Sequence, residues 1–193
     1  MWWKKQRRHP EIARFSRLLD AARRITGTGS LGVQHYALLV ARGDRLRLLE
    51  LKQAVPASMI QQHRAPANPW KSDAARVVET QRRSQRTQPL LLEAVMFRKL
   101  DFILRELSPG DDKLTVAKGK AQQRRLIRLA PWLGRVAAAS HRHTAGWRDA
   151  ATEKEIAVFA RGKAWRKQVA RYAIAYKKTV VQDWARFRRA TGQ

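Results

Sequence analysis

The chain contains no cysteine and few acidic residues. Of its 193 residues, 15 are Asp or Glu, against 41 that are Lys or Arg. The absence of cysteine excludes disulfide bonds and thiolate metal sites within the chain, and it is typical of a cytoplasmic protein. We therefore expect a cytoplasmic location and no metal site built on cysteine.

Long apolar runs are also missing. No stretch of about 18 consecutive apolar residues occurs, so the sequence predicts no membrane span. The first ten residues, MWWKKQRRHP, contain basic residues but no apolar run after them, which is unlike a secretory signal. With 44% hydrophobic residues the chain can still bury a core, and its length fits one domain or a little more.

The charge is large, positive and unevenly distributed. The formal net charge is +26; residues 1–24 carry 8 basic and 2 acidic side chains, residues 25–116 carry 14 and 9, and residues 117–193 carry 19 and 4. A field of this sign attracts polyanions such as nucleic acid. Three interpretations stay open: a nucleic-acid partner, an acidic protein partner, or a solvated basic surface with no partner.

The segment Gly27-Thr28-Gly29-Ser30-Leu31-Gly32 has the spacing G-x-G-x-x-G. In a dinucleotide-binding fold this segment follows a strand and opens a helix. Here the order is reversed, because residues 11–24 are predicted to form a helix and residues 33–41 and 46–53 two strands. Lys52 lies near the end of the second strand. A glycine loop beside a hairpin, with a lysine on the next strand, is typical of a kinase-like nucleotide site.

Each residue type in this pattern has a chemical reason. Glycines lack Cβ, so their backbone N–H groups can approach phosphate oxygens, and a lysine adds a point charge on the same phosphates. In kinases a glutamate on the following helix holds that lysine. Residues 73–88 are predicted to form such a helix, with Asp73 as its cap and Glu79 inside it. We therefore expect an ion pair between Lys52 and Glu79 beneath the glycine loop. The alternative is that the glycines only shape a tight turn.

Three segments together resemble a bacterial family called domain of unknown function 2252. They read RRITGTGSLGVQHYALLVARGD, LLELKQAVPASM and RVVETQRRSQ, and the resemblance covers roughly residues 20–190. It implies relation to the protein-kinase-like fold and binding of ATP or another phosphate ligand. The residues that match the family's glycine loop, strand lysine and helix glutamate are Gly27, Gly29, Ser30, Gly32, Lys52 and Glu79.

The chain departs from this family at its catalytic motifs. Family members carry an earlier G-D-x-H-x-x-N-F-G segment and an N-D-F-D-E motif, and neither occurs here. The acidic residues available in their place, Asp44 and Asp111-Asp112, lie in predicted turns. The chain thus resembles the C-terminal portion of a member, either partial, degenerate or one half of a split phosphotransferase. We expect no catalytic residue and no phosphoryl transfer by this chain alone, with Mg²⁺ held only if a partner or missing N-terminal half supplies the absent segment.

The second half of the predicted module is another strand pair. Residues 90–97 and 100–107 are predicted strands, and Pro109-Gly110 marks a break after them. In a kinase-like fold this break is the hinge, where the adenine would hydrogen-bond to backbone near Glu106-Leu107-Ser108.

Beyond residue 119 the pattern becomes helical. We expect helices over 120–143, kinked or divided by Pro131, over 152–161 and over 163–190. The last one has an apolar stripe that we expect to be core rather than a base-stacking platform: Trp165, Val169, Tyr172, Tyr176, Val180, Trp184 and Phe187. His141 and His143 diverge on their helix and have no third partner, so no metal site is predicted.

The predicted architecture is α+β. It consists of a basic lead helix in residues 1–24, a glycine-loop module in residues 25–108 and a basic helical region in residues 109–193. The module is expected to be a kinase-like small antiparallel sheet of about five strands with one packed helix. A nucleotide is the expected ligand, and nucleic acid bound through the basic helices is the alternative.

Overall fold

The structure is a computed structural model, and it describes residues 2–6, 10–15, 17–25, 32–58, 69–108 and 119–192. The chain forms two compact units, Met1–His143 and Thr144–Gln193. The first contains all the described strands, and the second consists of helices. The boundary expected after residue 108 falls inside the first unit.

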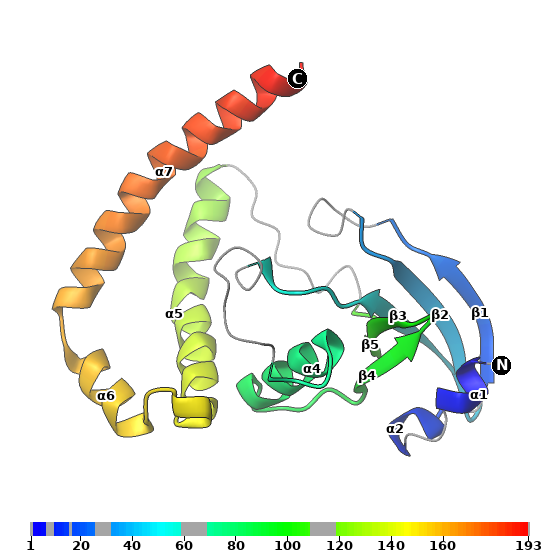
Figure 1. Cartoon of the computed structure of the whole chain (residues 1–193). Helices are drawn as coiled ribbons and strands as arrows, with labels where there is room; N and C mark the ends of the chain where they lie inside the picture. Colours follow the sequence, from blue (N-terminus) through cyan, green and yellow to red (C-terminus); the bar gives the residue numbers. More distant parts are fainter. Residues whose placement is uncertain are drawn as a thin grey trace. The chain divides into compact units, whose positions relative to one another are not determined.

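The first unit is built on a five-stranded antiparallel sheet in the order β1-β2-β3-β5-β4 (Figure 1). Its strands are β1 (Arg17–Arg23), β2 (His35–Arg42), β3 (Arg45–Gln53), β4 (Leu92–Phe97) and β5 (Leu100–Glu106). The four strands expected from sequence are confirmed to within two residues at each end. Tight turns join the hairpins, with Gly43 at φ +56° between β2 and β3. The α+β fold class is confirmed.

The helix expected over residues 11–24 is wrong. The described part of this segment forms a short helix, α2 (Pro10–Ala13), and then the edge strand β1. Strand β1 pairs antiparallel with β2 from Arg17↔Ala41 to Arg23↔Tyr36, with a register shift between Leu18 and Asp20. An exposed edge strand with such a shift does not alternate cleanly between apolar and polar residues, so pairing with β2 overrides the helical spacing.

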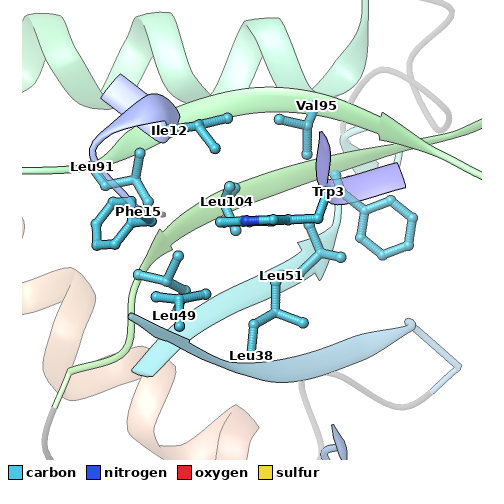
Figure 2. Packing of buried hydrophobic residues seen from close by; sticks show 11 residues of the cluster. Trp3, Ile12, Phe15, Leu38, Leu49, Leu51, Leu91, Val95 and Leu104 are labelled. Atoms are coloured by element: carbon cyan, nitrogen blue, oxygen red, sulfur yellow. The ribbon is translucent and has the colours of Figure 1, made fainter. Parts of the chain in front are cut away.

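One face of the sheet carries the main core. Leu49 and Leu51 of β3 point to this face together with Phe102 and Leu104 of β5, and all four are buried. The face is covered by N-terminal segments: Trp3 of α1 (Trp2–Gln6), Ile12 of α2 and the following Phe15 lie in the same cluster (Figure 2). The indole N–H of Trp2 donates to the carbonyl of Met96 at 2.8 Å and ties α1 to β4.

Helix α4 (Asp73–Ser84) packs on the opposite face, against β4 and β5. Ser72 is its N-cap and accepts from the backbone N–H of Ala75 at 3.1 Å. Asp73, the expected cap, is instead the first helical residue, and its N–H donates to Asp101 at 2.9 Å. Neighbouring side chains on a strand point to opposite faces, so Asp101 points away from the face of the core residue Phe102. The bond to Asp101 therefore places the start of α4 on the face away from the main core.

The remaining described elements are helical. Helix α5 (Lys120–His143) ends the first unit and contains Pro131 without being divided there. The second unit holds a short 3₁₀ turn at Trp147–Asp149, then α6 (Glu153–Arg161) and α7 (Ala164–Thr191). Neither α6 nor α7 has a buried residue, so the expectation that the stripe on α7 is core is wrong within this unit. No helix among the described residues is long and apolar enough to cross a membrane.

Candidate functional site

Only one end of the glycine segment falls in the described part of the chain. Gly27, Gly29 and Ser30 lie outside the described residues, as do Pro109-Gly110 and Asp111-Asp112. Gly32 is exposed and has φ +77°, a left-handed conformation that glycine adopts at little cost. No atom lies within 4 Å of where a Cβ would stand at Gly32, so backbone conformation rather than space favours glycine here.

The described residues that flank the glycine segment lie at one end of the sheet, beside Lys52. The N–H of Arg24 donates to the carbonyl of His35 at 2.8 Å, and His35 is the register partner of Lys52. One step further along, the N–H of Gln53 donates to the carbonyl of Gln34 at 2.8 Å. Lys52 is partly buried on β3. The structure therefore places Lys52 at the same end of the sheet as Arg24 and Gln34, which flank residues 26–31 in the sequence.

Glu79 does not join Lys52. It lies on α4 with its side chain 41% exposed and pairs with Arg83, one turn along the helix, at 3.7 Å. Among the described residues Lys52 has no ion pair, so the expected Lys52–Glu79 bridge is not formed. The reason is helical geometry: buried Val78 faces the sheet, and the next residue is turned by about 100°. Glu79 accordingly borders an open groove with Glu93 and Ala94 of β4.

The acid that stands close to Lys52 along the strand is Glu50. Residues 50 and 52 point to the same face of β3, because side chains alternate along a strand. Glu50 is only 7% exposed and His35 only 4%. The His35 Nε2 lies 2.6 Å from Oε1 of Glu50, and Arg105 donates from Nε to Oε2 at 2.5 Å. Arg24 is a further partner, with its guanidinium 3.5 Å from Oε1.

These partners decide the charge of Glu50. Burial raises the pKa of its carboxyl. The hydrogen bond and charge of Arg105, and then the charge and hydrogen bond of His35, together lower the pKa by more than burial raises it. The net result is a pKa below the ordinary value of 4.5, so the carboxylate stays ionised at neutral pH. We call Arg24, His35, Glu50 and Arg105 the Glu50 cluster.

The sequence contains a signal for this cluster outside the glycine, lysine and glutamate pattern. Glu50 is a lone acid within the apolar run Leu48-Leu49-Glu50-Leu51, and an acid there must find partners if the strand is buried. Its partner Arg105 lies directly opposite on β5, in the register pair Glu50↔Arg105. Both strands were predicted, but their register was not, so the pairing could not be inferred.

The same face becomes apolar towards the β2–β3 turn. Leu46 and Leu48 of β3 lie more than half exposed and form an open groove with Leu39 of β2 and Leu107 after β5. The backbone N–H of Leu107, one of the groups expected to meet an adenine, donates instead to the carbonyl of Leu48 at 3.0 Å. From one end to the other, this face therefore presents a lysine, an ionised cluster and an apolar groove.

Comparison with known proteins finds a family match over most of the chain. The family model described as "Uncharacterized protein conserved in bacteria (DUF2252)" matches residues 3–190. No curated protein and no solved structure matches the chain. Within the described residues, no group of three or more His, Cys, Asp or Glu side chains is placed to hold a metal ion.

Proposed function

The chain belongs to the bacterial family DUF2252, and we propose that it binds ATP or another phosphate ligand at the end of the sheet formed by the glycine segment and Lys52. The observation that carries this proposal is the position of Lys52. Arg24 and Gln34, which flank residues 26–31 in the sequence, lie at the lysine's end of the sheet, and glycine backbone beside a lysine is a general way to hold phosphate.

The order of the elements adds support. A strand, a glycine segment, a hairpin whose second strand carries lysine, a helix and a second hairpin follow one another here. In protein kinases a glycine-rich loop covers the phosphates and the lysine lies on the third strand. On this basis the chain is a partial or degenerate kinase-like protein, with the apolar groove at Leu39, Leu46 and Leu48 available to a nucleobase.

The Glu50 cluster changes how such a site would be held together. Glu79 pairs with Arg83 on α4 and not with Lys52. Glu50 instead fixes Arg24 and Arg105 on the face shared with Lys52, so three cations and one carboxylate surround the end of the sheet. This net positive charge favours a phosphate ligand.

The proposed role is binding without phosphoryl transfer by the chain alone. Transfer also needs a base and carboxylate or amide groups that hold Mg²⁺. The sequence carries neither G-D-x-H-x-x-N nor N-D-F-D-E, so any Mg²⁺ and any catalytic base would have to come from another segment or partner.

The first test is a titration with a fluorescent ATP analogue. We expect saturable binding that weakens at least about tenfold in Lys52→Ala, because loss of a desolvated charge–phosphate contact costs about 1.5–3 kcal/mol. The matched control is Lys154→Ala, since Lys154 is an exposed lysine on α6. Equal affinity of the wild type and Lys52→Ala, or equal losses in both variants, would contradict the proposed site.

A further inference from the structure

We infer that α7 is a docking surface for an acidic, amphipathic protein helix. Helix α7 leaves large apolar side chains in solvent. They are Val169, Tyr172, Ile174, Tyr176, Val180, Val181, Trp184 and Phe187, and each is about half exposed or more. Contiguous exposed apolar surface of this kind marks an interaction site in a soluble protein.

The rings along α7 are already ordered against one another. Tyr172 and Tyr176 stack with their centroids 5.5 Å apart and their planes 9° from parallel, and Trp184 and Phe187 stack at 5.7 Å. Together with Val169 and Val180 they recur at steps of three and four residues along 28 residues of helix. A partner helix that presents its own apolar stripe can pack against such a ridge without first ordering it.

The positive charge on α7 favours a negatively charged partner. The helix carries eight Lys or Arg residues and a single acid, Asp183, which pairs with Arg186 at 3.6 Å. A second copy of this chain would bring the same positive charge and is disfavoured by repulsion. An acidic partner gains favourable pairs along the flanks of the stripe and is drawn in faster at low salt.

The distribution of apolar residues favours a protein over a membrane surface. Ile174 and Val181 lie seven residues apart, and Ile174 is about 160° around the helix from Tyr176. A helix lying in a bilayer interface buries one side only, whereas a helix packed among other helices buries more than one. An apolar surface on two sides is therefore the pattern of bundle packing.

The aliphatic members of the stripe favour a protein over nucleic acid. Single-stranded nucleic acid stacks its bases on aromatic rings between cations. Val169, Val180, Ile174 and Val181 offer no ring to a base, yet they are as exposed as the tyrosines. A partner that buries all of these side chains needs apolar side chains of its own.

The test uses the full chain and a pair of synthetic helices. The probe is an amphipathic peptide as long as α7, with leucine along one seam and glutamate on its flanks; its twin carries lysine in place of glutamate. We expect the glutamate peptide to bind at least about tenfold more tightly than its twin, measured by calorimetry, with binding weakened by salt.

Variants then locate the surface. Tyr172→Ala/Tyr176→Ala is expected to weaken the glutamate peptide about tenfold, because paired aromatic anchors dominate such interfaces. Alanine is a good helix former, so α7 stays helical, which circular dichroism checks. The control Gln168→Ala/Gln182→Ala changes two exposed side chains on the same helix and is expected to leave the affinity unchanged.

Three outcomes would overturn the inference. The first is equal binding of both peptides, or no binding of the glutamate peptide. The second is tighter binding to vesicles of phosphatidylcholine and phosphatidylserine at about 7:3, or to a duplex of about 20 base pairs, than to the glutamate peptide. The third is unchanged affinity in Tyr172→Ala/Tyr176→Ala.

Discussion

The sheet of the first unit and helix α7 of the second unit place their large apolar side chains in opposite environments. In the first unit Phe102, Leu49 and Leu104 are fully buried between the sheet and the N-terminal segments. In the second unit the rings of α7 lie about half exposed, although they recur at steps of three and four residues along the helix. Regular apolar spacing identifies a surface that packs, but it does not identify what packs on it.

The largest expected effect on stability comes from a pair of variants that replace a phenylalanine by alanine, one in each unit. Phe102→Ala is expected to destabilise the chain by about 3–5 kcal/mol, because it removes a ring from a filled core. Phe187→Ala, on α7, should cost less than about 1 kcal/mol because that ring is 52% exposed, against 0% for Phe102. Urea unfolding monitored by circular dichroism measures both. Similar losses in the two variants would break the comparison between the units.

A second pair of variants compares two acids within the first unit. Glu50→Ala is expected to cost about 2–3 kcal/mol, because His35 and Arg105 lose a buried hydrogen-bonded partner. Glu79→Ala removes an exposed pair within one helix and is expected to cost about 0.5 kcal/mol or less. The same urea experiment ranks them. If Glu79→Ala lowered the free energy of unfolding more than Glu50→Ala, the role assigned to the Glu50 cluster would be wrong.

The Glu50 cluster also predicts a pH dependence. The pKa of Glu50 is lower in the folded chain than its ordinary value of 4.5, so the folded state favours the ionised form. Its contribution to stability is fully present above pH 4.5 and declines as pH falls through the folded-state pKa. We expect the free-energy difference between the wild type and Glu50→Gln to shrink as the pH of urea unfolding is lowered from 7 to below 4. A difference that stays constant over this range would contradict the ionised cluster.

What could be predicted from sequence depends on whether the signal is local. The turns at Gly43 and at Arg98-Lys99 and the apolar residues between them are local signals, so these strands were predicted correctly. Strand β1 was missed because an exposed edge strand is specified by its neighbour β2 and not by its own pattern.

The candidate site divides in the same way. The position of Lys52 at one end of the sheet followed from local motifs. The Glu50 cluster depends on the register of β3 with β2 and β5, and the direction of Glu79 depends on how α4 rotates against the sheet. Neither register nor rotation is encoded in the spacing of single residues along one segment, so the bridge predicted for Glu79 failed.

The central claim is that the phosphate site lies in the first unit, at the glycine segment and Lys52. The most direct measurement is backbone amide NMR of the labelled chain titrated with an ATP analogue. We expect shift changes concentrated in residues 24–35 and 50–53, and their loss in Lys52→Ala. Changes confined to the basic helices α5 and α7, with residues 24–35 and 50–53 unaffected, would contradict the claim and show that charge alone attracts the nucleotide.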